Sequence, residues 1–148
     1  MSEKKHPLMA TDIIIEYNDG KKEGIVLITR KYPPYGIAIP GGMAEYGISL
    51  EENAAKEAKE ETNLEIIIDH QNPLCVNSKP ERDPRGHVIS VTYVAKGIGN
   101  LKSGDDAASA ALYDINEVKQ LMKNNSLVFD HSDILKQYLS FRGYNYKI

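Results

Sequence analysis

Residues 41–64 constrain the fold of this 148-residue chain more than any other segment. A pair of glycines is followed by Ser49, which stands three residues before Glu52 at the start of a run of good helix formers. A serine and a glutamate at this spacing are typical of a helix N-terminus, because each side chain can bond the backbone N–H of the other. Asn63 can end the helix in a left-handed conformation, and the apolar residues 64–68 then predict a strand. The segment therefore predicts a glycine turn, a helix and a strand in succession.

Three carboxylates of this helix, Glu57, Glu60 and Glu61, are spaced i, i+3 and i+4 and are expected to converge on one face. Carboxylates held this close repel one another unless they are solvated, protonated or joined by a cation. A hard divalent ion such as Mg²⁺ prefers oxygen ligands and keeps positions open for phosphate and water, so the acids favour phosphate chemistry. The alternative is a solvated helix face. The adjoining turn at Gly41 and Gly42 favours a ligand site, because a glycine backbone can approach a ligand closely.

The remaining pattern predicts an α/β layered domain. Small residues recur beside the acids at about 100° per residue, so the helix is expected to lie close on a sheet. These small residues are Ala54, Ala55, Ala58 and Thr62. Alternating apolar runs predict strands at residues 9–17, 23–31, 36–40, 88–95 and 110–113, and helical spacing predicts helices at 114–123 and 132–141.

Read from Gly42, the helical segment resembles the Nudix box, Gly-x5-Glu-x7-Arg-Glu-U-x-Glu-Glu-x-Gly-U with U an apolar residue, over its full length and without a gap. The resemblance implies an α/β fold, the Nudix-type α/β/α sandwich around a mixed β-sheet. It also implies a hydrolase of nucleoside diphosphates linked to another group, with Mg²⁺ or Mn²⁺ as cofactor. By the same resemblance Glu57 and Glu61 are metal ligands, Glu60 assists them, and the Gly41 carbonyl offers a backbone ligand.

Three positions depart from the box: Ile48 replaces Glu, Lys56 replaces Arg, and Asn63 replaces Gly. The family's Glu and Arg at the first two positions commonly interact, so the joint change predicts that this ion pair is lost. Losses of this kind around an intact ligand set typically reduce activity or metal affinity by roughly 10- to 100-fold. The resemblance thus leaves room for a slow enzyme.

Residues 77–87 form a polar segment between two predicted strands and contain Pro80, Arg82, Arg85 and His87. Its plain interpretation is a long turn with solvated arginines. Beside the Nudix box, however, Pro80 and the string Arg-Asp-Pro-Arg-Gly-His resemble small bacterial and archaeal ADP-ribose pyrophosphatases. That resemblance implies that Arg82 and Arg85 bind phosphate or terminal ribose through charge-assisted hydrogen bonds. His87 is open between a structural role at a strand start and a substrate contact.

Other segments give weaker predictions. Residues 32–35 favour a rigid turn over an adenine-stacking site, and residues 127–131 favour a cap on the last helix through Asp130 or Ser132. Residues 104–109 match a loop where relatives often supply a glutamate base. The base is then Asp105 or Asp106, or else one of the helix acids Glu57 and Glu60.

The whole chain predicts a small cytoplasmic protein forming one Nudix domain over residues 1–148. No apolar run approaches the roughly 20 residues of a membrane span, and the first residues lack the apolar core of a signal peptide. The net charge of −3 argues against a nucleic-acid partner, and the lone Cys75 excludes a disulfide framework. Relatives of this branch are often homodimers, so the resemblance implies a homodimer.

These observations together favour a Mg²⁺-dependent Nudix hydrolase that converts ADP-ribose and water to AMP and ribose 5-phosphate. Two alternatives stay open at this point. One is a Nudix hydrolase acting on an oxidised nucleotide or a dinucleotide coenzyme. The other is a non-catalytic or slow nucleotide-binding regulator of the same fold, against which the retention of all three helix acids argues.

Overall fold

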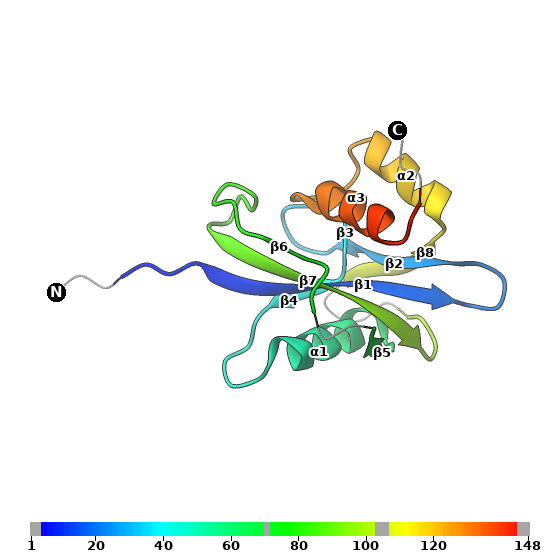
Figure 1. Cartoon of the computed structure of the whole chain (residues 1–148), viewed down its shortest axis with the longest axis horizontal. Coiled ribbons are helices and arrows are strands. Elements are labelled where there is room, and N and C mark those ends of the chain that lie inside the picture. The colour runs from blue at the N-terminus through cyan, green and yellow to red at the C-terminus, as the bar shows by residue number, and fades with distance from the viewer. Residues whose placement is uncertain (1–3, 70–71, 103–106, 145–148) are drawn as a thin grey trace.

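Two long parallel strands, β1 (Leu8–Asn18) and β7 (Val88–Ile98), form the centre of the sheet in the computed structural model, which describes residues 4–69, 72–102 and 107–144. They pair from Leu8 beside Val88 to Glu16 beside Lys96. The remaining strands pair antiparallel to their neighbours, which gives an eight-stranded mixed sheet within the described residues (Figure 1).

The other strands pair with β1, β2 or β7. On one side of β1 lie β2 (Glu23–Arg30) and, nearer its start, β4 (Gly41–Met43). Strand β2 also pairs with β3 (Ile37–Ala38) and with β8 (Ala107–Tyr113). On the far side of β7 lie β5 (Glu65–Ile68) and β6 (Cys75–Asn77).

Three helices in the described part of the chain cover the two faces of this sheet. Helix α1 (Leu50–Thr62) lies on one face, and α2 (Ile115–Lys123) and α3 (His131–Phe141) lie on the other (Figure 1). The alternation along β1 explains both layers, because successive side chains of a strand point to opposite faces. Ile13 and Ile15 pack with Ala54 and Ala58 of α1. Ile14 belongs to a separate cluster that includes residues of α2 and α3. The predicted α/β/α sandwich around a mixed sheet is confirmed.

Helix α1 begins and ends where the sequence predicts. Ser49 is the N-cap and its Oγ accepts the Glu52 backbone N–H at 3.1 Å. Asn63 adopts the left-handed conformation with φ 65°, and its N–H donates to the Lys59 carbonyl. The buried face is turned slightly from the predicted one, since Ala55 is exposed while Asn53 and Glu61 are buried.

Several boundaries were predicted wrongly. The glycine pair is not simply a turn, because Gly41–Met43 pairs with β1 as strand β4. Strand β6 was not predicted, because three residues are too short for a periodic signal. Asp130 is the N-cap residue of α3, yet neither it nor any other side chain makes a capping hydrogen bond there. Ser132 lies inside the helix.

The turn predicted at residues 32–35 is present as a series of bends after β2, with Tyr32 and Tyr35 exposed. Within the described part of the chain, no helix is long and apolar enough to cross a membrane.

Candidate functional site

The acidic side of α1 packs against β4, and the glycines of β4 permit that contact. A Cβ atom at Gly42 would lie 2.5 Å from Cδ of Glu57, so the carboxylate occupies the space that any side chain would fill. At Gly41 a Cβ would meet the Thr11 carbonyl and the Asp12 side chain, and the Gly41 N–H donates to Glu61 Oε2 at 3.3 Å. These glycines are therefore required by close packing inside the protein, and not only by access for a ligand.

Asn53 fixes the loop between β4 and α1 in place. It is 1% exposed and its Nδ2 donates to Thr11 Oγ1 at 2.9 Å and to the Met43 carbonyl at 3.3 Å. Its Oδ1 accepts the Glu45 backbone N–H at 3.2 Å. Three hydrogen bonds hold this buried amide in place, because the loss of any one would leave a polar atom with neither a protein partner nor water. Asn53 thus ties β1, β4 and the loop to the first turns of α1.

The three acids of α1 do not all face the same way. Glu61 is 5% exposed and lies with Glu57 against β4, whereas the half-exposed Glu60 pairs with Lys56 Nζ at 3.1 Å. The same ammonium lies 3.8 Å from Glu57 and 3.6 Å from Glu45 in the preceding loop. Ile48 and Lys56 form no ion pair, as expected, but an ion pair between this loop and the helix is still present. A carboxylate three residues earlier than Ile48 provides the partner.

The donors at this place suit a hard divalent cation, which Nudix hydrolases generally use. Glu57 and Glu61 offer carboxylate oxygens beside the backbone of β4, and oxygen donors are what Mg²⁺ and Mn²⁺ prefer. In the described ranges, no three His, Cys, Asp or Glu side chains gather around one point that could hold a metal ion. The structure therefore brings Glu57 and Glu61 together at β4 and turns Glu60 toward Lys56.

A pocket of about 160 Å³ lies on the other side of the glycine strand. Gly41 and Gly42 form part of its wall, and its lining includes three arginines, Arg30 at the end of β2 and Arg82 and Arg85 in the loop of residues 78–87. Pockets with apolar walls and a few charged groups are typical ligand sites. The apolar lining residues come from several elements: Ala10, Ile28, Ala38, Ile39, Met43, Val88 and Phe129.

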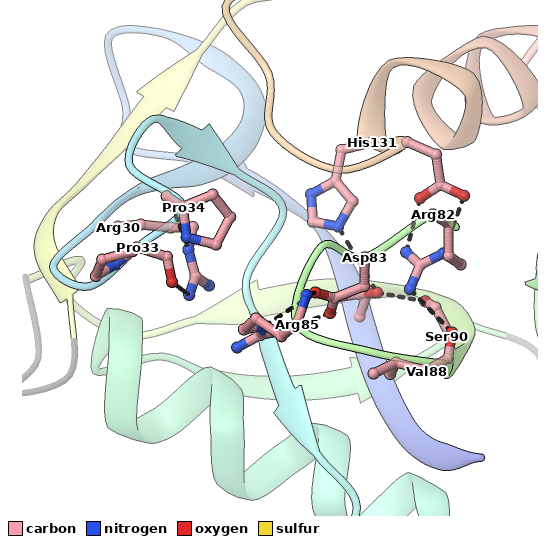
Figure 2. A network of polar contacts seen from close by, with 11 residues as sticks. Arg30, Pro33, Pro34, Arg82, Asp83, Arg85, Val88, Ser90 and His131 are labelled. Carbon is pink, nitrogen blue, oxygen red and sulfur yellow. Dashed lines mark hydrogen bonds and ion pairs between the residues drawn. The ribbon is translucent and has the colours of Figure 1, made fainter. Parts of the chain in front are cut away.

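Arg82 is bound inside the protein. Its side chain is 4% exposed, and Nε and Nη2 donate to the two carboxylate oxygens of Asp130 at 3.0 and 2.7 Å (Figure 2). A further N–H donates to the Val88 carbonyl at 3.3 Å. Burial by itself lowers the pKa of Arg82, but the hydrogen bond and charge of Asp130 outweigh it and the pKa is raised. The pair joins the 78–87 loop to the start of α3, which explains why the Asp130 side chain does not cap that helix.

Arg85 projects further outward, and its side chain is 45% exposed. Its Nη2 and Nε bond the buried carboxylate of Asp83 at 2.8 and 3.1 Å, and Asp83 Oδ1 also accepts the Arg85 backbone N–H. Burial favours the neutral form of Asp83, but the bonds from Arg85 dominate, so the pKa of Asp83 lies below its ordinary value. Asp83 therefore sets the direction of the Arg85 side chain at the pocket (Figure 2).

Arg30, at the end of β2, and Phe129, just before α3, also line the pocket. The guanidinium carbons of Arg30 and Arg85 lie 5.1 and 5.2 Å from the centre of the Phe129 ring. Arg30 also donates to the carbonyls of Pro34 at 2.8 Å and Pro33 at 3.3 Å (Figure 2).

A buried imidazole and a buried carboxylate lie deeper in the same pocket. His131 is 2% exposed and its Nδ1 accepts the Ile39 backbone N–H at 3.0 Å, so its Nε2 carries the proton when the ring is neutral. Nε2 lies 3.8 Å from Oδ2 of Asp12, and that oxygen accepts a hydrogen bond from the Ser90 hydroxyl. Burial lowers the pKa of His131.

Of the residues predicted to bind substrate, Arg82 and Arg85 line this pocket, whereas Pro80 is exposed and is not among its lining residues. His87 is exposed, and its Nε2 lies 2.9 Å from the Ser78 carbonyl. The candidate bases Asp105 and Asp106 lie outside the described residues.

Four other residues of the pocket were not predicted to bind substrate, namely Asp12, Arg30, Phe129 and His131. Phe129 and His131 belong to the segment 127–131, which was expected only to cap the last helix. Each of the four lies in or next to a strand or helix, where the sequence pattern predicts only secondary structure and no ligand contact. The one signal that could have pointed to Asp12 and His131 is that each is a titratable residue next to an apolar run.

Residues 7–138 match the NUDIX domain family, and the chain belongs to that family. It is 43% identical over 141 residues to a Methanocaldococcus jannaschii protein named ADP-ribose pyrophosphatase, an alignment that covers 93% of this chain and 76% of the relative. The resemblance seen in the residues of the box is thus confirmed, and the protein is a Nudix pyrophosphohydrolase.

Solved structures agree on the fold. A MutT/nudix family protein from Enterococcus faecalis superposes with a TM-score of 0.76 at 29% identity, covering 95% of this chain and 64% of that one. The NUDIX domain of NrtR from Shewanella oneidensis, solved in complex with ADP ribose, superposes with a TM-score of 0.75 over 93% of this chain and 90% of that one. Its identity is 21%, so it supports the fold alone.

Proposed function

We propose that this protein hydrolyses ADP-ribose to AMP and ribose 5-phosphate. The observation that carries the proposal is the contact of Glu57 and Glu61 with a glycine strand whose other side opens into an arginine-lined pocket. The name of the Methanocaldococcus jannaschii relative supports the substrate. In the reaction one water adds across the P–O–P bridge, so that each product keeps one phosphoryl group.

Glu57, Glu61 and the Gly41 carbonyl are the proposed ligands of Mg²⁺ or Mn²⁺, with Glu60 assisting at the edge of the helix. The ion would neutralise the pyrophosphate and make water easier to deprotonate. Lys56, which lies within 4 Å of both Glu57 and Glu60, restrains their carboxylates from the solvent side. The base that takes the proton from water is proposed to be Glu57 or Glu60, or an aspartate at position 105 or 106.

We propose different roles for Arg82 and Arg85, the two arginines in the loop of residues 78–87. Arg82 holds the loop against α3 through its buried pair with Asp130, and Arg85, which is partly exposed, contacts the terminal ribose or phosphate. Pro80 shapes the entry to this loop. The divided roles follow from exposure, since a guanidinium that is 4% exposed has little surface to offer a ligand.

The proposal extends to the setting of the enzyme. We place the chain in the cytoplasm as one Nudix domain over residues 1–148, acting as a homodimer on a small nucleoside diphosphate derivative. The family match over residues 7–138 and the single described sheet support the one-domain organisation.

The test is a substrate panel with purified protein and Mg²⁺. ADP-ribose, an oxidised nucleoside triphosphate and dinucleotide coenzymes are incubated separately, and products are identified by chromatography. ADP-ribose should have the highest kcat/KM and give AMP with ribose 5-phosphate. A higher kcat/KM for any other member of the panel would transfer the proposal to that substrate.

The metal ligands are tested in the same assay. Glu57→Gln and Glu61→Gln should each lower kcat by several orders of magnitude while the fold persists, because each removes one negative oxygen ligand at nearly constant volume. Glu65→Gln, an exposed acid just beyond the helix, is the matched control and should leave kcat unchanged. Near-normal turnover in either ligand variant would end the proposed mechanism.

A further inference from the structure

We propose that Asp12 is a specificity-determining residue, whose Oδ1 accepts a hydrogen bond from the 2- or 3-hydroxyl of a ribose in the substrate. The inference rests on the proposed function for the class of substrate, a nucleoside diphosphate joined to a second sugar. Asp12 lies on β1 beside Gly41 of β4 and Thr92 of β7, and it lines the same pocket as the three arginines.

Only one oxygen of the Asp12 carboxylate has a hydrogen-bond partner in the described residues. Oδ2 accepts from the Ser90 hydroxyl and lies 3.8 Å from Nε2 of His131. Oδ1 has no donor in residues 4–69, 72–102 and 107–144, and it lies next to Gly41, where an added Cβ would be 2.4 Å from it. The Asp12 side chain is 11% exposed. Because buried polar atoms are almost always bonded, this oxygen favours a donor from a ligand.

The carboxylate is held in one orientation. Ser90 lies on β7 and His131 is the first residue of α3, and Figure 2 shows both beside the arginines of the pocket. His131 is itself held by the Ile39 backbone N–H, which donates to Nδ1 at 3.0 Å. Turning the carboxylate would break the bond from Ser90 in a buried place. Oδ1 is therefore an acceptor whose position is set before the substrate binds.

The charge of Asp12 decides which part of a substrate can approach Oδ1. A phosphoryl group is negatively charged and would be repelled by a carboxylate at contact distance. The same carboxylate acts electrostatically on Arg30, Arg82 and Arg85, so the pocket holds both signs of charge. Oδ1 therefore suits a neutral hydrogen-bond donor. In a nucleoside diphosphate derivative these donors are the sugar hydroxyls and the N–H groups of the base.

The size and lining of the pocket favour a sugar over a base. Its volume of about 160 Å³ is below the range of pockets that hold a whole ligand, so it takes one part of the substrate. The Phe129 ring, on which a base could stack, already contacts the guanidinium groups of Arg30 and Arg85. The His131 ring lies 5.2 Å from it as well. A ribose needs no ring to stack on and offers two adjacent hydroxyls.

Binding of the products and their deoxy forms tests this contact without catalysis. Calorimetric titrations in EDTA compare ribose 5-phosphate with its 2-deoxy and 3-deoxy forms, and AMP with its 2′-deoxy and 3′-deoxy forms. The parent should bind one product about 10-fold or more tightly than one of its deoxy forms, as expected for a hydrogen bond to a charged group. The product that shows this preference identifies which ribose of ADP-ribose enters the pocket.

Variants of Asp12 separate a substrate contact from a structural role. Loss of a purely structural carboxylate would change the affinity for a product and its deoxy form equally, which leaves their ratio as it was. Asp12→Asn should instead lower the ratio by about 3-fold or more, because a neutral amide bonds a hydroxyl more weakly than a carboxylate does. Asp12→Ala should abolish the preference. Asp19→Asn, at an exposed acid in the turn after β1, is the matched control and should keep the ratio of the parent.

If only one Asp12 variant folds, that variant decides. If neither folds, NMR of the parent replaces them: the carboxyl ¹³C resonance of Asp12 should shift more with the preferred product than with its deoxy form. Equal affinities of the parent for both products and their deoxy forms would overturn the contact. So would an unchanged ratio in the deciding variant, or equal NMR shifts.

The outcome is separable from that of the proposed function. If ADP-ribose is hydrolysed but Asp12 does not affect the ratio, the contact fails and the function stands. If Asp12 sets the ratio but ADP-ribose is not hydrolysed, the contact stands and the proposed substrate is wrong.

Discussion

Replacing Arg82 should destabilise this protein strongly, because its buried guanidinium joins the loop of residues 78–87 to the start of α3. Arg82→Met removes three hydrogen bonds, two of them to the Asp130 carboxylate, from a side chain that is 4% exposed. Removing one partner of a buried pair costs about 3–5 kcal/mol, mostly because the other charge is left without a partner. The Asp130 side chain is 19% exposed, so water can solvate the unpaired carboxylate and lower that cost. We expect a loss near the lower end, about 3 kcal/mol.

Arg85→Met provides the comparison. The Arg85 guanidinium is 45% exposed, but the Asp83 carboxylate that it bonds is 2% exposed and would keep only the bond from the Arg85 backbone N–H. Arg85→Met should therefore also destabilise the protein, because it leaves a buried carboxylate without its ion-pair partner. Unlike Arg82→Met, Arg85→Met should in addition raise the KM for ADP-ribose, because Arg85 is the proposed substrate contact.

The assay is urea unfolding of the two single variants, of Asp130→Asn and of the double variant Arg82→Met with Asp130→Asn. Because the double variant leaves no buried charge without a partner, its loss should be smaller than the sum of the single losses by about 2 kcal/mol. Additive losses, or a cost below about 1 kcal/mol for Arg82→Met, would refute the view that the buried pair holds this loop.

Three further predictions follow from contacts of the site. Gly42→Ala should lower kcat by about 10-fold or more, because the new Cβ would lie 2.5 Å from Cδ of Glu57 and displace its carboxylate; unchanged kcat would contradict this. The free energy of unfolding should fall as the pH drops below about 6.5, because the unfolded state protonates His131 while burial lowers its pKa in the folded state, and a His131→Gln variant should lose that slope in chemical denaturation. Lys56→Met should lower kcat, whereas Glu45→Gln should do so only while the lysine is present, a dependence that a double-mutant cycle on kcat would measure.

The helix and its ends could be read from the sequence because their causes are local. The Ser49 cap, the left-handed Asn63 and the alternation of Ile13, Ile14 and Ile15 between two faces all depend on spacings of one to four residues. Such short-range geometry is a property of the backbone, so it holds before any tertiary contact forms. The family resemblance of the box rests on the same segment.

The pairing of charges was decided only by the tertiary structure. Arg82 bonds an acid 48 residues away, and Lys56 reaches Glu45 instead of a residue at position 48. The periodicity of apolar residues predicts which side of a helix or strand is buried, but it does not predict which distant element packs against that side. Arg30 and Phe129 meet because β2 and the start of α3 border the same pocket, and that adjacency is set by packing the two helical layers onto the sheet.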